Sequence, residues 1–166
     1  MTHRYRLANL NNEKDSQMVG ALVAGFEASQ KRTIAQETQG LMEKLKDFPT
    51  TRAYVCEVDR GGFQAAGLAL CFLGFSTFLQ KPLLNLHDFF MIPEFQGQGL
   101  GRGFLAFLEK ESRREGWGRV TLEAYQDNSR AVALYESCGF KGSGNQGERV
   151  CYFYKKDVAD KSTDCL

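Results

Sequence analysis

Four glycines at alternate positions, from Gly97 to Gly103, constrain this chain more than any other feature of its sequence. They lie between an apolar stretch at 83–92, ended by a proline, and a segment at 99–115 whose leucines and phenylalanines have helical spacing. Glycines at such a junction let the backbone approach a bulky diphosphate, which the free N–H groups and dipole of the helix start would attract. The segment therefore predicts either an anion site or a flexible turn without a ligand.

The spacing of these glycines excludes two common phosphate-binding loops. No Gly-x-x-x-x-Gly-Lys-Ser/Thr string is present. A Gly-x-Gly-x-x-Gly fingerprint would place Arg102 or Phe104 where its third glycine is required. An anion site here must therefore be of another kind.

Periodicity along the rest of the chain predicts alternating strands and helices. Apolar residues recur at helical spacing in four segments, 15–26, 36–48, 99–115 and 129–137. Strand-like segments are found at 5–10, 53–58, 67–75, 83–92, 119–125 and 150–154. The two longest of these strands are apolar enough to be buried on both faces, and a hairpin at 76–82 joins them. This order predicts one α+β or α/β domain around a mixed sheet.

Composition limits the class of protein further. The 166 residues, 43% hydrophobic and 25% charged, fit one domain at 1–156 followed by a polar tail at 157–166. Lys+Arg 21 and Asp+Glu 20 are spread along the chain and give a net charge of +1, so nucleic acid is not an expected partner. No apolar run approaches the roughly 18 residues of a membrane span, and the N-terminus lacks a signal-peptide core. We therefore expect a cytoplasmic protein without a membrane partner.

The 5 cysteines and 2 histidines show no metal-ligand spacing. No Cys-x-x-Cys pair is present, and three of the cysteines lie inside apolar stretches. An odd number of buried thiols is typical of a reducing compartment. We expect no bound metal.

A second motif follows the glycine segment. Its fixed positions, in the pattern Asn-x-x-Ala-x-x-x-Tyr-x-x-x-Gly-Phe, are occupied by Asn128, Ala131, Tyr135, Gly139 and Phe140. The earlier pattern, Gln/Arg-x-x-Gly-x-Gly/Ala, is matched by Gln96, Gly99 and Gly101. In this order the two motifs resemble those of the GNAT superfamily of N-acetyltransferases. The resemblance implies a three-layer α+β fold with a splayed, mostly antiparallel sheet, and acetyl-CoA as co-substrate.

The resemblance also implies roles for single residues in cofactor binding. The backbone of Phe89, Phe90 and Met91 would bind the pantetheine arm of acetyl-CoA and polarise the thioester carbonyl. Asn128 would form a hydrogen bond near the same arm. The pyrophosphate would be held by the loop and the first helical turn, that is by Gln96, Gly97, Gln98, Gly99, Leu100, Gly101 and Arg102.

Tyr135 matches the position of the family's general acid, beside the departing thiolate. A phenol of pKa about 10 is a weaker acid than a thiol of about 8.5, so full proton transfer is uphill by roughly 2 kcal/mol. We therefore expect Tyr135 to donate a strong hydrogen bond to the sulfur as charge develops there. The same spacing also fits a core tyrosine on an amphipathic helix, without a catalytic role.

The attacking amine must lose a proton, because an alkyl amine of pKa about 10.4 is nearly all protonated at pH 7. Asp88 and His87 interrupt the apolar strand and are equal candidates for the base. Strict alternation places Asp88 on the face of Leu86 and Phe90, with His87 opposite, whereas a β-bulge would exchange those faces. Either side chain could instead simply pair with a neighbour.

Within the superfamily, the segment 70–91, which ends in Leu-His-Asp-Phe-Phe-Met before the glycine loop, most resembles the spermidine/spermine (diamine) N-acetyltransferase branch. That branch usually shows a Glu-Asp pair where this chain has His87-Asp88. The resemblance implies a small amine as acceptor: a polyamine, a diamine or an amino-acid-like amine. The alternatives are a protein or peptide amine acetyltransferase and an acyl-CoA-binding module without catalysis. Homodimers are common in the family, and the apolar Phe75, Phe78 and Leu79 of the hairpin could contribute an interface.

Overall fold

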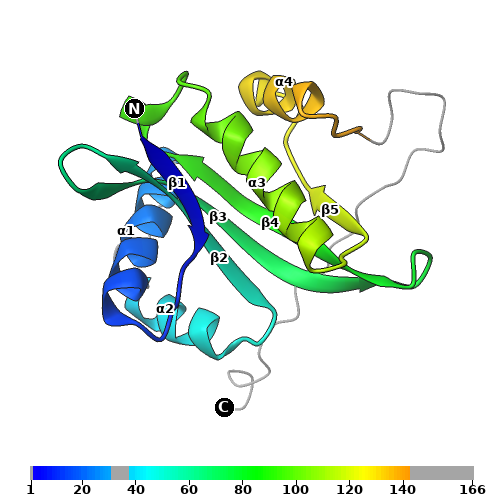
Figure 1. Cartoon of the computed structure of the whole chain (residues 1–166), viewed down its shortest axis with the longest axis horizontal. Coiled ribbons are helices and arrows are strands. Elements are labelled where there is room, and N and C mark those ends of the chain that lie inside the picture. Colours follow the sequence, from blue (N-terminus) through cyan, green and yellow to red (C-terminus); the bar gives the residue numbers. More distant parts are fainter. Residues whose placement is uncertain (1, 31–37, 143–166) are drawn as a thin grey trace, which may run out of the picture.

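The computed structural model describes residues 2–30 and 38–142, whose helices and strands largely follow the prediction (Figure 1). In chain order the elements are β1 (His3–Leu7), α1 (Glu13–Ser29), α2 (Thr38–Asp47), β2 (Thr51–Asp59), β3 (Phe63–Ser76), β4 (Lys81–Met91), the 3₁₀ helix η1 (Pro93–Phe95), α3 (Leu100–Arg114), β5 (Arg119–Leu122) and α4 (Ser129–Ser137). The helix predicted at 129–137 has those bounds, and the other three agree within three residues at each end. The strand predicted at 150–154 and the tail at 157–166 lie outside the described residues.

The strands form a single sheet in the order β1-β2-β3-β4-β5. The first four are antiparallel neighbours, and β5 runs parallel to β4, so the sheet is mixed and mostly antiparallel as predicted. β5 pairs with β4 only from Leu83–Arg119 to Leu86–Leu122, although β4 continues to Met91. Beyond Leu86 the two strands diverge, and this divergence is the splay that the family resemblance implied.

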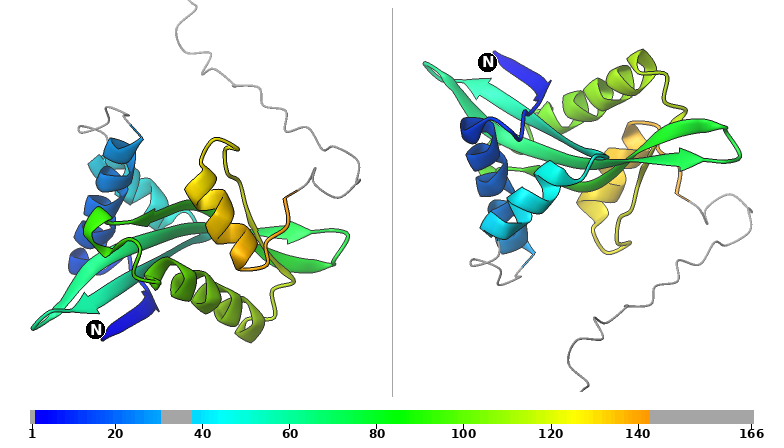
Figure 2. Two further views of the ribbon diagram at one scale, coloured as in Figure 1. Left: turned by 90° about the horizontal axis from the view of Figure 1, so that it is seen from above. Right: turned by 90° about the horizontal axis from the view of Figure 1, so that it is seen from below.

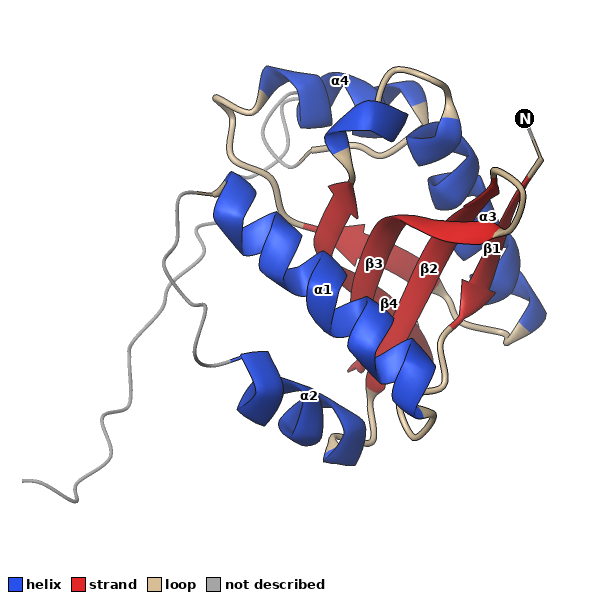
Figure 3. Ribbon diagram, turned by 90° about the vertical axis from the view of Figure 1, so that its left-hand side faces the viewer, coloured by secondary structure: helices blue, strands red, loops and turns tan. Residues whose placement is uncertain are grey.

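Helices cover both faces of the sheet and give three layers (Figure 2, Figure 3). On one side, which we call the α3 face, α3 packs over β2, β3 and β4 around the fully buried Phe104. On the other side, the α1 face, α1 and α2 enclose a second core that includes Val19, Leu45 and Leu68. Successive residues of a strand face opposite sides, so the central strands contribute to both cores.

The prediction that both long strands are buried on both faces is only partly right. Residues 66–71 of β3 are buried, but the strand continues to Ser76 and Phe75 is 63% exposed. The β3–β4 hairpin extends past the ends of α2 and α3 (Figure 1). The apolar composition identified the strands correctly, whereas the length of the covering helices decides how much of each strand is buried.

A charged network lies where β1, β2 and α1 meet. The Arg6 guanidinium donates to both Asp15 carboxylate oxygens at 2.8 and 2.7 Å and to Glu57 at 2.7 Å, and Arg4 donates to Glu57 at 2.8 Å. The hydrogen bonds from Arg6 lower the pKa of Asp15. Burial alone would raise the pKa of Glu57, but its hydrogen bonds to Arg6 and Arg4 outweigh that effect and lower it. The network fastens the edge strand β1 to the rest of the fold.

Three cysteines lie within the described residues and are free thiols, as predicted. Cys56 and Cys71 are buried and Cys138 is half-buried. Burial raises the pKa of Cys56 to about 12 and raises that of Cys71 as well, so neither thiol is reactive at neutral pH. Across residues 2–30 and 38–142, no group of three or more His, Cys, Asp and Glu side chains is arranged to hold a metal ion. Within the same ranges, no helix combines the length and the apolar character that crossing a membrane requires.

Candidate functional site

A β-bulge in β4 decides where Asp88 and His87 lie. The β3–β4 register pairs Leu86 and Asp88 with consecutive residues of β3, so His87 is an extra residue on β4. Asp88 is paired with Leu70, which belongs to the core on the α1 face, and directly paired residues share a face. The His87 ring lies on the same side, because it meets the edge of Phe72 at 5.6 Å between ring centroids.

The bulge corrects the arrangement that strict alternation predicts. Leu86 packs into the core on the α3 face and is therefore opposite Asp88, not beside it. Phe90 does share the α1 face with Asp88, and His87 joins them there instead of lying opposite. The half-buried Asp88 and the exposed His87 are thus both presented on one side of the strand.

Within residues 2–30 and 38–142, no strand pairs with the second half of β4 on the side where β5 pairs only as far as Leu86, and we call this side the open edge. The N–H of Ile92 donates to the carbonyl of Ala66 at 2.9 Å, so the backbone N–H of Ile92 points toward β3. Backbone groups of an antiparallel strand point alternately to its two edges. The N–H groups of Phe89 and Met91 consequently face the open edge, and that of Phe90 faces β3.

The glycine segment turns the chain from η1 into α3. Gly97 and Gly99 have φ angles of +74° and +79°, which strain residues that carry a Cβ. A Cβ at either position would meet no atom within 4 Å, so the surface is open there. The N–H groups of residues 100–102 have no partner within the helix, and the dipole adds positive potential at this end. The Gln98 side chain folds back and donates to the Glu94 carbonyl at 2.7 Å.

Packing explains the glycine at Gly103 but does not require one at Gly101. A Cβ at Gly101 would make ordinary contacts with Leu134 at 3.5 Å and Phe89 at 3.8 Å, where α3 meets α4 and β4. A Cβ at Gly103 would lie 2.4 Å from the Tyr5 hydroxyl, which real Cβ atoms essentially never do. Only the first two of the four alternating glycines therefore shape the open surface.

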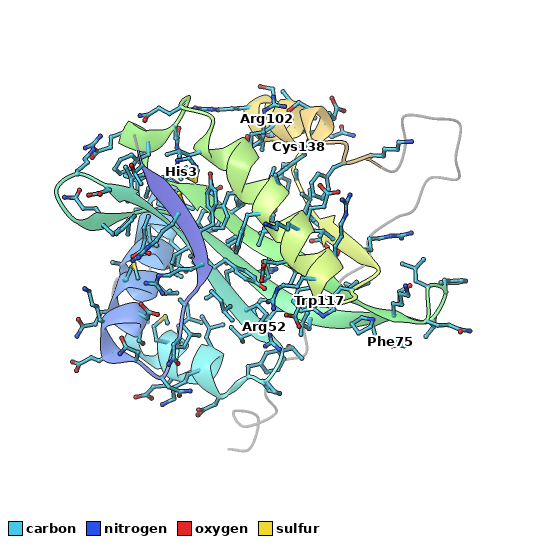
Figure 4. The ribbon with its side chains drawn as sticks, viewed as in Figure 1. His3, Arg52, Phe75, Arg102, Trp117 and Cys138 are labelled. Atoms are coloured by element: carbon cyan, nitrogen blue, oxygen red, sulfur yellow. The ribbon has the colours of Figure 1, made fainter. Side chains whose placement is uncertain are left out.

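Two polar side chains of this region join α4 to the rest of the site. Gln96 donates from Nε2 to the Met91 carbonyl at 2.7 Å and accepts at Oε1 from Arg130 at 2.7 Å. Arg102 donates to the Ser137 carbonyl at 3.2 Å, at the junction of α3 and α4 (Figure 4). No residue of α4 is fully buried, so these hydrogen bonds near both of its ends help to fix its position.

α4 carries the two remaining motif residues. Asn128 is its N-cap, with Oδ1 accepting from the N–H of Ala131 at 3.3 Å, so a structural role explains this asparagine without a ligand. The half-buried Tyr135 packs 6.3 Å from Phe89 and 6.0 Å from Phe140 between ring centroids. Burial raises the pKa of the Tyr135 hydroxyl, which therefore remains a hydrogen-bond donor at neutral pH.

These groups meet around the open edge of β4. Tyr135 and the glycine segment lie on the α3 side of the strand, and Asp88 and His87 lie on the α1 side. The outward N–H groups of Phe89 and Met91 stand between the two. A carbonyl bound at that edge can be attacked from one side while its leaving group departs on the other.

Sequence reasoning missed two residues that support this site. Arg130 occupies a variable position of the second motif and gave no signal. Tyr5 donates from its hydroxyl to the Leu100 carbonyl at 2.9 Å, across 95 residues of sequence. The glycine at Gly103 was the one available indication that another group approaches α3 closely.

Comparison with known proteins identifies the family. The model of the acetyltransferase (GNAT) family matches residues 22–140, and this chain belongs to that family. Ribosomal protein bS18 alanine N-acetyltransferase of Escherichia coli (strain K12) is 46% identical over 48 residues, 29% of this chain and 32% of that protein. N-alpha-acetyltransferase RimI of Mycobacterium tuberculosis (strain ATCC 25618 / H37Rv) is 32% identical over 104 residues, 61% of each chain. The match thus spans about a third of the first relative and about three fifths of the second.

Solved structures share the fold over nearly the whole chain. A probable acetyltransferase superposes with a TM-score of 0.77 at 17% identity, covering 97% of this chain and 100% of that one. AAC(6')-Iy, in complex with the bisubstrate analogue CoA-S-monomethyl-acetylneamine, gives a TM-score of 0.72 at 14% identity, covering 95% and 100%. The likeness confirms the predicted mixed sheet flanked by helices.

Proposed function

We propose that this protein is an N-acetyltransferase that transfers an acetyl group from acetyl-CoA to a primary amine by direct attack in a ternary complex. The observation that carries the proposal is the open edge of β4, where two outward N–H groups lie beside a glycine-lined helix start. Family membership supports the same activity, as do the names of the acetyltransferases to which the chain is similar.

The residues present fit acetyl-CoA, which supplies the acetyl group as a thioester. The open surface at Gly97 and Gly99 and the N–H groups of residues 100–102 suit a pyrophosphate. The outward N–H groups of Phe89 and Met91 suit the pantetheine arm and the thioester carbonyl, whereas the N–H of Phe90 serves the ladder with β3. The roles implied for Gln96 and Arg102 become indirect in this proposal, because their side chains bind Met91 and Ser137.

Proton transfers are assigned to groups on opposite sides of β4. The acceptor nitrogen must give up a proton, and we propose Asp88, assisted or replaced by His87, to take it on the α1 face. The departing sulfur gains negative charge, and Tyr135 donates a hydrogen bond to it on the other side. Because burial raises the pKa of Tyr135, donation of a hydrogen bond fits this residue better than complete loss of its proton.

The acceptor we propose is a small primary amine: a polyamine, a diamine or an amino-acid-like amine. Because Asp88 is the one carboxylate of the His87-Asp88 pair, within this class we favour diamines and amino-acid-like amines over the more highly charged polyamines. A second candidate is the α-amine of a protein or peptide. It is favoured by the similarity to ribosomal protein bS18 alanine N-acetyltransferase and to N-alpha-acetyltransferase RimI.

Release of free CoA from acetyl-CoA tests the proposal. The acceptor panel comprises spermidine, putrescine, lysine, an aminoglycoside, a lysine-containing peptide and a peptide with N-terminal alanine. We expect turnover with the small amines, and turnover confined to the alanine peptide would favour the second candidate. Binding of acetyl-CoA by calorimetry without turnover of any amine would contradict catalysis and leave an acyl-CoA-binding module.

We also propose that the protein forms a homodimer in the cytoplasm. The β3–β4 hairpin projects from the fold (Figure 1), and on it Phe78 is 99% exposed and Phe75 63% exposed. Two large apolar side chains exposed so close together suit a protein–protein contact. The free thiols are consistent with a reducing compartment. Light scattering on the wild type and on the variant Phe78→Ser would test the dimer. A monomeric wild type would contradict it.

A further inference from the structure

We propose that Tyr5, in the edge strand β1, is a positioning residue for the cofactor site. Its hydroxyl holds the first turn of α3 in place, and this turn carries the N–H groups assigned to the pyrophosphate. The inference rests on the proposed function, because it assigns Tyr5 a role in binding CoA.

The contacts of Tyr5 connect two parts of the molecule that are distant in sequence. Its hydroxyl donates to the carbonyl of Leu100, the first residue of α3, at 2.9 Å. Its ring stacks on Phe104 at 5.0 Å with an interplanar angle of 23°, and lies 5.7 Å from Phe107. The ring therefore packs against the middle of α3 while its hydroxyl reaches the start of the helix.

Gly103 makes this contact possible. An added Cβ at Gly103 would lie 2.4 Å from the Tyr5 hydroxyl oxygen and 3.2 Å from the ring carbon that carries it. A glycine in the interior of a helix is unfavourable compared with alanine, so an alanine would be preferred here if nothing approached. Gly103 and Tyr5 thus form a matched pair. Gly103 affects the anion site only indirectly, because it leaves room for the Tyr5 hydroxyl that holds the first turn of α3.

Tyr5 is suited to hold the helix without taking part in the reaction. Burial raises the pKa of its hydroxyl to about 12, so the group stays a donor across the neutral range. β1 is itself anchored, because the neighbouring Arg6 binds Asp15 and Glu57. If the first turn of α3 shifted, all of its free N–H groups would move out of line with the pyrophosphate. Loss of the hydroxyl should therefore weaken CoA binding and leave the chemical step almost unchanged.

The test compares Tyr5→Phe with Tyr54→Phe by calorimetry with CoA and by steady-state kinetics with acetyl-CoA. Tyr54 is a matched control, because it is buried in the same core, packs 5.8 Å from Phe107, and also has its pKa raised to about 12. For Tyr5→Phe we expect the Kd for CoA and the KM for acetyl-CoA to rise about fivefold to tenfold, with kcat within twofold. For Tyr54→Phe we expect both constants to stay within twofold of wild type.

Two further variants extend the test, and the first of them, Gly103→Ala, keeps the proposal open to contradiction if Tyr5→Phe folds poorly. Gly103→Ala should weaken CoA binding although alanine favours the helix. Adding Tyr5→Phe to Gly103→Ala should restore part of the affinity, because the clashing oxygen is gone. Unchanged CoA affinity in Tyr5→Phe or Gly103→Ala, or an equal loss in Tyr54→Phe, would overturn the inference. Failure of the wild type to bind CoA would instead contradict the proposed function.

Discussion

The two sides of β4 are built in different ways. On the α3 side, the candidate site consists of Tyr135 and of the backbone N–H groups that a glycine-rich turn presents, next to those of the open edge. On the α1 side it consists of the side chains of Asp88 and His87, which share a face only because of a bulge. Backbone donors follow from local chain geometry, whereas side chains on a strand depend on its register with a neighbour. One extra residue in β4 is enough to rearrange the second kind of site.

The strongest test of the α3 side is Tyr135→Phe. We expect kcat to fall about 100-fold, within the range for loss of a positioned proton or hydrogen-bond donor. The Kd for CoA should hardly change, because the ring contacts with Phe89 and Phe140 are retained. Steady-state kinetics and calorimetry measure the two quantities separately. Tyr125→Phe is the control, since Tyr125 is 80% exposed. Unchanged turnover in Tyr135→Phe would eliminate the role.

On the α1 side, Asp88→Asn and His87→Ala decide which side chain accepts the proton. An alkyl amine has a pKa of about 10.4 and a peptide α-amine about 7.7, so the alkyl amine depends more strongly on a base. For the true base we expect kcat/KM to fall at least about tenfold with an alkyl amine and less with an α-amine. The pH–rate profiles of both variants supply the comparison. If both profiles match the wild type, neither residue is the base, and the α1 side serves binding alone.

The smallest expected effect on activity belongs to a third region, the network at β1. Asp15→Asn should leave kcat unchanged and lower the free energy of unfolding by about 2 kcal/mol, because it weakens the hydrogen bonds between the buried Asp15 side chain and the half-buried, charged Arg6. Its carboxyl pKa is lowered in the fold, so its stabilisation is present above the unfolded value of about 3.9 and is lost as pH falls below it.

Urea denaturation at pH 7 and at pH 3 measures this loss. The wild type should lose stability on acidification, and Asp15→Asn should lose less. Glu13→Gln is the matched control, because Glu13 is also acidic and in the first turn of α1 but lies on the surface, where its hydrogen-bond partner is Gln17. We expect it to change stability by less than about 0.5 kcal/mol. An equal effect of both substitutions would show that a carboxylate near the start of α1 stabilises the fold without its hydrogen bonds to Arg6.

The sequence predicted the fold and the α3 side of the site better than the α1 side. Helical periodicity and the bend at Gly97 and Gly99 are local properties, and the structure has the corresponding elements. The bulge at His87 is not local, because it depends on which residue of β3 faces Asp88. Tyr5 was missed for the same reason, since its hydrogen bond to Leu100 exists only after β1 has joined the sheet. Contacts of this kind leave no periodic pattern in a single sequence.

The divergence of β4 from β5 also has a consequence for solvent exchange of backbone amides. In the described part of the chain, no strand pairs with β4 on its outer side beyond Leu86. The amide hydrogens of Phe89 and Met91 should therefore exchange rapidly with deuterated water, while those of Phe90 and Ile92 stay protected by the ladder with β3. Fast and slow exchange should thus alternate residue by residue along one strand. A bound thioester would slow the fast pair, so that this alternation itself reports the occupancy of the edge.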